Sequence, residues 1–111
     1  MPDYAYVVLS QPVRGQEDVY NQWYSERHLR DVMAVPGFVS AQRFQLADPA
    51  AEGAPSQRYM AIYTMRTDTP DALLDTLRDL VESGQMEMSD ALDQDNLTTI
   101  LYEAITPVVS A

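Results

Sequence analysis

The sequence predicts an α+β fold in which a four-stranded antiparallel sheet carries two helices on one face. Four runs rich in β-branched and aromatic residues alternate with two segments of helical period, in the order β-α-β-β-α-β. At 111 residues the chain has the length of one domain, so residues 1–111 are expected to form a single unit with one core. This order of elements is that of the split βαβ, or ferredoxin-like, plait.

The first half of the chain supplies two strands and one helix. Tyr4 to Leu9 is an aromatic and β-branched run, and it is expected to be the first strand. Glu17 to Ala34 has helical spacing with acids in its first turn, and Pro36-Gly37 ends it sharply. Phe38 to Leu46 alternates as a second strand does, and the small and Pro-bearing residues Ala47 to Ser56 are expected to form a mobile hairpin loop.

The second half repeats the pattern. Arg58 to Met65 reads as the third strand. Thr69-Pro70 gives an N-cap followed by the first helical position, and Gly84 is expected to stop the second helix. Gln85 to Asp95 is acidic and contains Met, which is typical of a connecting segment with a short helical turn. Leu97 to Ile105 is expected to be the last strand.

Both faces of this sheet are expected to be buried. In the third strand Tyr59, Ala61 and Tyr63 point to one side, and Met60 and Ile62 point to the other. The two helices cover only one face, so the other face needs a second layer. A second copy of the same sheet, related by a twofold axis, is the simplest supply. The pattern therefore predicts a homodimer that pairs through its sheet faces.

Charge and composition exclude several classes of partner and site. The net charge is −10, from 17 acidic and 7 basic residues, which argues against nucleic acid and against anionic lipid. The acidic stretch from Asp68 to Asp95 reads as a solvated face. No apolar run has membrane-spanning length and no signal segment is present, so a soluble cytoplasmic protein is expected.

Residues 20–28, YNQWYSERH, hold the single Trp, two of the seven Tyr and the single His of the chain. A helix that only closes a core would use Leu, Ile and Ala. On a helical wheel Tyr20, Tyr24 and His28 share the side that faces the sheet, whereas Leu29 and Met33 fall on the outer side. Polar tips on an apolar side are typical of a helix that lines a polar-spotted cavity, so the sequence indicates a small-molecule site.

The inward His28 has two interpretations. It is either held in the core by a hydrogen bond to a backbone carbonyl or to Asp31, or it serves a ligand as general acid, general base or hydrogen-bond donor. Arg43 needs an anionic partner if it is buried, and that partner is a ligand, Asp31 or Glu103. The candidate catalytic residues are His28 and Tyr24, and the candidate substrate-binding residues are Tyr20, Asn21, Trp23, Arg43, Tyr6 and Tyr63.

Other chemistries fail on the inventory of residues. With no Cys and one His, one chain cannot build a zinc site, a facial triad or a Cys–His pair. No Gly-x-Ser-x-Gly elbow, Gly-x-Gly-x-x-Gly turn or P-loop occurs. A haem on His28 is conceivable, but few basic residues are present for its propionates. Neither a metal nor a cofactor is therefore expected.

Several motifs together resemble a known family. Asn21-x-Trp23-Tyr24-x3-His28-Leu29, Val35-Pro36-Gly37-Phe38, Arg43-Phe44, the run from Arg58 to Tyr63 and Tyr102-Glu103-x3-Pro107 resemble the EthD-like group of the dimeric α+β-barrel superfamily. The resemblance implies a ferredoxin-like protomer that pairs with a twin into a barrel and has its own pocket between sheet and helices. It also implies that His28, Trp23 and Tyr24 are pocket residues. Relatives include cofactor-independent monooxygenases, polyketide cyclases, dehydratases, lactone isomerases and haem-handling enzymes.

Two functional hypotheses follow. The first is a cofactor-independent enzyme acting on a small apolar carbonyl or aromatic compound, by oxygenation, dehydration, cyclisation or isomerisation. In it His28 moves a proton, Tyr24 and Asn21 position the substrate oxygen, and Arg43 or a strand Tyr stabilises negative charge. The second is a non-catalytic binding or accessory protein of a degradation pathway. A purely structural dimer, a third possibility, predicts no cavity beside His28.

Overall fold

The computed structural model describes residues 1–111, and its elements follow the predicted order. The elements are β1 (Asp3–Ser10), α1 (Glu17–Trp23), the π-helical turn η1 (Tyr24–His28), α2 (Leu29–Met33), β2 (Phe38–Gln45), β3 (Tyr59–Arg66), α3 (Pro70–Glu82), the 3₁₀ turn η2 (Gln94–Asn96) and β4 (Thr98–Glu103). The last strand ends two residues earlier than predicted. The only helical turn between α3 and β4 is η2, at the end of the connecting segment.

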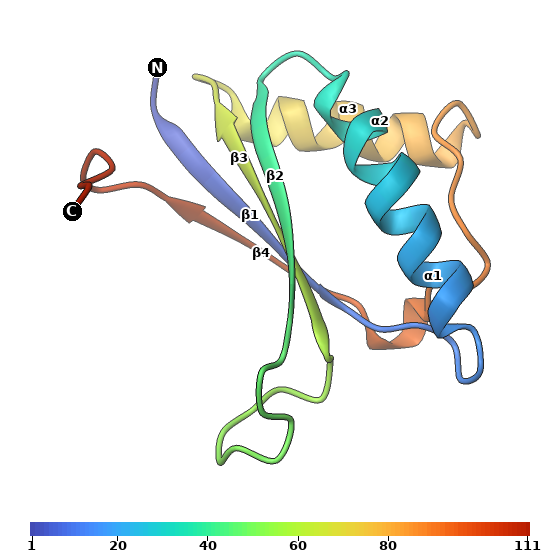
Figure 1. Cartoon of the computed structure of the whole chain (residues 1–111). Coiled ribbons are helices and arrows are strands. Elements are labelled where there is room, and N and C mark those ends of the chain that lie inside the picture. The colour runs from blue at the N-terminus through green and yellow to red at the C-terminus, as the bar shows by residue number, and fades with distance from the viewer.

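The four strands form one antiparallel sheet in the order β2-β3-β1-β4. Tyr6 in the middle of β1 lies opposite Tyr63 of β3 on one side and opposite Leu101 of β4 on the other. The helices α1, α2 and α3 all lie on the same side of this sheet (Figure 1). The predicted ferredoxin-like plait is confirmed. None of the helices has the length and apolar character needed to cross a bilayer.

The first helix is interrupted, which the sequence did not predict. In η1 the backbone N–H of Leu29 donates to the carbonyl of Tyr24, five residues back, so this turn holds one residue more than an α-helical turn. The extra residue rotates everything that follows by about 100° relative to a regular helix. The prediction that Leu29 and Met33 face outward was therefore wrong, because both are partly buried against the core.

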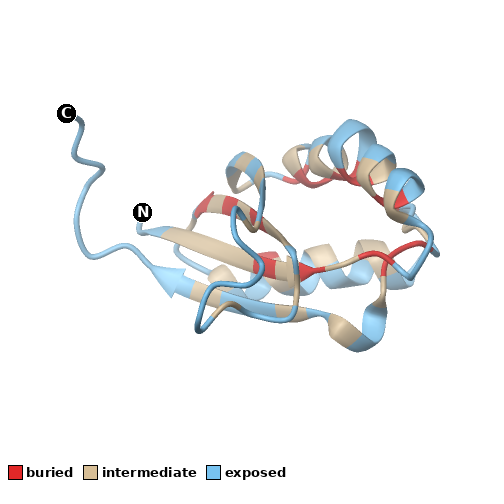
Figure 2. Cartoon of the chain, turned by 60° about the horizontal axis from the view of Figure 1, so that its bottom comes forward, coloured by how far each residue is buried: buried red, intermediate tan, exposed pale blue.

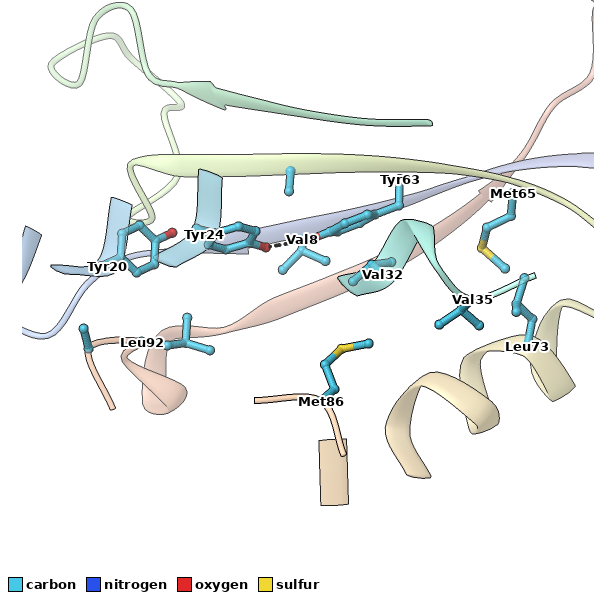
Figure 3. Packing of buried hydrophobic residues seen from close by; sticks show 12 residues of the cluster. Val8, Tyr20, Tyr24, Val32, Val35, Tyr63, Met65, Leu73, Met86 and Leu92 are labelled. Atoms are coloured by element: carbon cyan, nitrogen blue, oxygen red, sulfur yellow. Dashed lines mark hydrogen bonds between the residues drawn. The ribbon is translucent and has the colours of Figure 1, made fainter. Parts of the chain in front are cut away.

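The core lies between the sheet and the helices. Tyr63 and Met65 of β3 and Tyr20 and Val32 of the helical layer have 2% or less of their surface exposed. Figure 3 shows these side chains meeting between the two layers, and Figure 2 shows that the buried parts of the strands and helices face one another. Gly37 joins α2 to β2 with φ of 107°, and the side chain of Leu73 from α3 packs against it. The predicted stop at residues 36 and 37 is thus also a packing site.

The sheet face turned away from the helices is open and apolar. By strand register this face carries Ile62, Phe44, Ile100 and Tyr102, and the last three are 40%, 37% and 56% exposed. The segment after β4 runs away from the body and is exposed along its length (Figure 2). Several exposed large apolar side chains on one sheet face are typical of a face that another layer covers.

Candidate functional site

A cavity of about 680 Å³ lies between the sheet and the helices. Thirteen of its nineteen lining residues are hydrophobic, and its volume is that of a site for a small organic ligand. The apolar wall comes from β1, β4, α3 and the segment before β4, namely Val8, Leu101, Leu74, Leu77, Val81, Met88, Leu92 and Leu97. The purely structural alternative predicted no such cavity beside His28, and the structure contradicts it.

His28 lies in the wall of this cavity with 7% of its surface exposed. The indole of Trp23 stacks on its ring at a centroid distance of 4.7 Å, and the ring of Tyr24 meets it edge-on at 5.1 Å. The Nδ1 atom of His28 is enclosed by protein and has no hydrogen-bond partner. The Nε2 atom also makes no hydrogen bond within the chain and is not enclosed, so Nε2 is the ring nitrogen left for a ligand in the cavity that His28 lines. No bond to a backbone carbonyl or to Asp31 holds the ring.

Burial sets the charge of this imidazole. Removal from water lowers the pKa of His28 from 6.5 to about 4, and the nearby carboxylate of Asp31 only partly opposes this. His28 is therefore neutral at pH 7. A neutral imidazole offers one N–H donor and one bare nitrogen acceptor, so the cavity has one polar group that can do either.

Two tyrosine hydroxyls form a second polar spot. The hydroxyl of Tyr63 donates to the hydroxyl of Tyr24 over 3.1 Å, as the dashed line in Figure 3 shows, and both residues line the cavity. Burial raises the pKa of Tyr24 to about 12 and also raises that of Tyr63, so both stay protonated. Tyr24 receives a hydrogen bond and has no acceptor for its own proton within the chain. That proton is available to a ligand. Tyr6 lies beside Tyr63 and also lines the cavity.

Trp23 links the helix to the segment that closes this end of the cavity. Its indole N–H donates to the backbone carbonyl of Glu87 over 3.2 Å, and Arg27 pairs with the carboxylate of Glu87 at 2.7 Å. These contacts fix the segment that carries Met88 into the cavity wall. The sequence treated this acidic segment as solvated surface. Its Met and Leu residues were the signal that part of it packs inward.

Arg43, Asn21 and Tyr20 do not line the main cavity. The Arg43 guanidinium lies 4.5 Å from the centre of the Tyr24 ring, and it donates to the side chains of Ser25 at 2.7 Å and Asn21 at 2.9 Å. The predicted pairing of Arg43 with Asp31 or Glu103 was wrong. The guanidinium instead lies against aromatic ring faces and donates hydrogen bonds to neutral side-chain oxygens. Arg43 and Asn21 line a separate hollow of about 310 Å³ at the edge of β2.

Tyr20 has a structural position. It is fully buried, and its hydroxyl shares a hydrogen bond of 2.6 Å with the hydroxyl of Ser10. Burial raises its pKa, so it stays protonated. Asn21 also donates to the hydroxyl of Tyr59 over 3.2 Å. Tyr20, Asn21 and Arg43 thus form a polar layer behind Tyr24 rather than a wall of the cavity.

The rim of the cavity is charged. Asp75, Arg78 and Glu82 of α3 and the neutral Gln94 of η2 lie along it, and Arg78 pairs with Asp75. The sequence did not single out these residues, because helical spacing showed only that the Leu residues of α3 face inward. No group of three or more acidic or imidazole side chains is placed to hold a metal ion.

Comparison with solved structures identifies the fold, although no family model and no curated protein matches the sequence. A proposed monooxygenase of Shewanella loihica has a TM-score of 0.64 at 14% identity, over 96% of this chain and 99% of that one. An EthD family protein of Bacillus halodurans has a TM-score of 0.63 at 17% identity, over 95% of this chain and 100% of that one. MhuD, the haem degrader of Mycobacterium tuberculosis, has a TM-score of 0.64 at 12% identity, over 96% and 99%.

At these identities the likeness establishes the fold. An EthD family protein is among the matches, as the motif from Asn21 to Leu29 predicted. Another match, from Jannaschia, is described as a dimeric ferredoxin-like protein, with a TM-score of 0.60 at 15% identity. The resemblance is confirmed at this level. The chain has the ferredoxin-like fold, which the matched EthD family protein and the dimeric Jannaschia protein share.

Proposed function

We propose that this protein is an enzyme that acts, without a cofactor, on a small and largely apolar carbonyl or aromatic compound held beside His28. One observation carries the proposal: an imidazole with no hydrogen-bond partner within the chain lies in the wall of an apolar cavity of about 680 Å³. A buried polar group without a partner costs free energy, so a site that retains one has a use for it. A ligand in the cavity would bond to the other ring nitrogen, Nε2, which is not enclosed and also has no partner within the chain.

The remaining polar groups support the same chemistry. Tyr24 presents a free hydroxyl proton, and Tyr63 behind it donates to the Tyr24 oxygen. Fixed neutral donors in an apolar site stabilise negative charge that develops on a substrate oxygen. Enolisation, dehydration, ring closure and oxygen transfer to an enol all pass through such charge. The matched monooxygenase and haem degrader fit a fold that processes small molecules.

The test is turnover of protein freed of metals and flavin. A thermal-shift screen of aromatic acids, lactones and polyketide fragments selects ligands, because a compound that binds only the folded state raises Tm. Selected compounds are then incubated with wild type and with His28→Ala. We expect wild type to keep its activity and the variant to lose at least about a hundredfold, the usual share of one acid–base or donor group. Equal turnover in the two proteins would end the proposal.

A non-catalytic binding protein is the second candidate, and the low pKa of His28 favours it. A group that takes up a proton only near pH 4 is a weak base at neutral pH. This candidate predicts saturable binding without turnover. It also predicts that Trp23→Leu weakens binding more than His28→Ala does, because aromatic area would then carry the affinity. The reverse order would favour the enzyme.

Haem does not fit this cavity well. His28 could offer Nε2 to an iron, but the two propionates of a haem need cationic partners. Arg78 is the only cation at the rim, it already pairs with Asp75, and Glu82 adds a second negative charge there. The proposed function therefore does not involve haem. A haemin titration followed by absorbance checks this, and we expect no stoichiometric complex.

We also propose that the open sheet face pairs with a second copy of the chain. The face carries Phe44, Ile100 and Tyr102 exposed, and the Jannaschia protein of this fold is described as dimeric. Light scattering after gel filtration should give a dimer for wild type and a monomer for Ile100→Asp. The control is Val19→Asp, which places the same charge on an exposed position of α1 and should leave the dimer intact. A monomeric wild type would contradict this proposal.

A further inference from the structure

We propose that His28 carries its proton on Nε2 and donates it as a hydrogen bond to an oxygen of the ligand. The ligand class is then a planar apolar compound with a carbonyl, enolate or phenolate oxygen. This inference rests on the proposed function, because it requires that a guest enters the cavity. It assigns His28 the role of a neutral donor, which differs from the proton-moving role that the sequence favoured.

The surroundings of the two ring nitrogens of His28 decide which of them carries the proton. Nδ1 of His28 is enclosed by protein and has no partner. An enclosed N–H without an acceptor is rarer and more costly than an enclosed lone pair. A neutral imidazole has one N–H, which therefore lies on Nε2. Nε2 makes no bond within the chain and is not enclosed, and His28 lines the cavity, so we infer that this donor meets a guest there.

The charged and titratable groups around the His28 ring do not stabilise its protonated form. On its own helix the ring has Asp31 nearby, and Tyr24 and Trp23 pack against it. Across the cavity lie Tyr63 of β3 and, on α3, the charged side chains of Asp75, Arg78 and Glu82. None of these groups makes a hydrogen bond or ion pair with the ring. Nothing in the chain therefore holds an imidazolium in place, and the donor is the neutral N–H.

The Tyr24 hydroxyl is a second hydrogen-bond donor on the same wall of the cavity as His28. Tyr24 meets His28 edge-on at 5.1 Å and borders the same cavity. Because Tyr63 fills an acceptor site of the Tyr24 oxygen, the Tyr24 proton is the group left for a guest. Arg43 lies 4.5 Å from the centre of the Tyr24 ring, and a cation there makes the hydroxyl a better donor. Two neutral donors, with no carboxylate hydrogen-bonded to either, select a ligand oxygen that accepts and disfavour a hydrocarbon.

The tautomer can be measured directly, because His28 is the only histidine in the chain. Full-length protein labelled with nitrogen-15 histidine gives a single imidazole in long-range proton–nitrogen correlation spectra. At neutral pH we expect Nε2 at the shift of a protonated nitrogen and Nδ1 at the shift of a bare one. The opposite pattern, or an imidazolium, would overturn the assignment whatever the ligand.

The ligand class is tested with two probes of the same shape, 2-acetylnaphthalene and 2-ethylnaphthalene, titrated against Trp23 fluorescence. Only the first has an acceptor oxygen. His28→Gln keeps an N–H donor near the Nε2 position, whereas His28→Leu removes it. We expect the ketone to bind His28→Gln within a few-fold of wild type and His28→Leu about tenfold more weakly, as loss of one hydrogen bond predicts. The hydrocarbon should bind all three proteins alike.

The outcomes separate this inference from the proposed function. If both probes bind wild type equally, a guest enters the cavity but the donor assignment is wrong. If neither probe binds, the cavity does not admit such compounds, and the proposed function fails together with the ligand class. Tyr24→Phe gives a variant that does not alter the imidazole. It should weaken the ketone alone, and an equal loss for both probes would also contradict the pair of donors.

Discussion

When the pH is lowered, part of the loss in the free energy of unfolding of this protein should come from His28. The folded-state pKa of His28 is about 4, whereas the free imidazole has 6.5. The unfolded chain therefore binds the proton more tightly, so stability present above pH 6.5 is lost as the pH falls toward 4. Linkage gives a loss of about 2 kcal/mol at pH 5 and about 3 kcal/mol at pH 4. Because the ring is only 7% exposed, solvent screening reduces this little.

His28→Gln removes this component and leaves the other titrating groups in place. Urea unfolding followed by circular dichroism at pH 7 and pH 5 gives the free energy of unfolding of each protein. The difference between wild type and variant should shift by about 2 kcal/mol in favour of the variant over this range. Arg30→Gln is the control, since it removes an exposed cation from the same helix and should give a constant difference. Parallel pH curves for wild type and His28→Gln would refute the account of a buried neutral imidazole.

Three further substitutions test the packing around the site by urea unfolding. Tyr63→Phe removes the hydroxyl that donates to Tyr24 and should lower the free energy of unfolding by about 1 kcal/mol. An unchanged free energy of unfolding would show that this hydrogen bond does not stabilise the protein. Arg43→Met removes two hydrogen bonds and the cation–π contact with Tyr24, and it should lower the free energy of unfolding by about 1–3 kcal/mol. Arg43→Lys should recover little of this stability, and full recovery would contradict a role for the planar guanidinium. Gly37→Ala should cost about 1–3 kcal/mol more than Gly53→Ala, because both have positive φ but only at Gly37 does a methyl meet a leucine of α3; equal losses would argue against that contact.

Much of the fold follows from local pattern. The alternation in β3 placed Ala61 and Tyr63 on the same side of the sheet, and in the structure this is the side that the helices bury. The start predicted at Thr69-Pro70 and the stop predicted at Gly84 agree with the observed ends of α3. These features depend on period and on single-residue conformational preference, which a sequence displays directly. The helical wheel of residues 17–34 placed Tyr24 and His28 on the side that faces the sheet, and both residues line the cavity.

The π-helical turn could not be read from the sequence. A helical wheel assumes the same rotation at every residue, and the extra residue in η1 breaks that assumption midway. Contacts from outside the helix accompany it, since Arg43 of β2 donates to Ser25 within the turn. The positions of Leu29 and Met33 were wrong for this reason. Wide turns of this kind are frequent at functional sites, which agrees with the turn carrying both Tyr24 and His28.

Arg43 shows a second limit of sequence reasoning. A buried arginine predicts an anion, but Arg43 is only partly buried, and its guanidinium contacts three tyrosine rings and two neutral side-chain oxygens. Ring faces carry partial negative charge, so tyrosines distant in sequence can replace a carboxylate. Which strand faces which ring depends on register between β2 and β3. Charge inventory alone does not contain that information.

We expect the cavity beside His28 to admit an organic guest, and the single imidazole of the chain reports on such binding directly. A library of aromatic ketones, lactones and phenols is titrated into histidine-labelled protein while the two ring nitrogen signals are followed. We expect at least one oxygen-bearing aromatic to shift the Nε2 signal saturably in wild type. Leu101→Phe, which adds bulk to the β4 wall of the cavity, should abolish that shift. Signals that no compound moves, or that move equally in Leu101→Phe, would contradict the account.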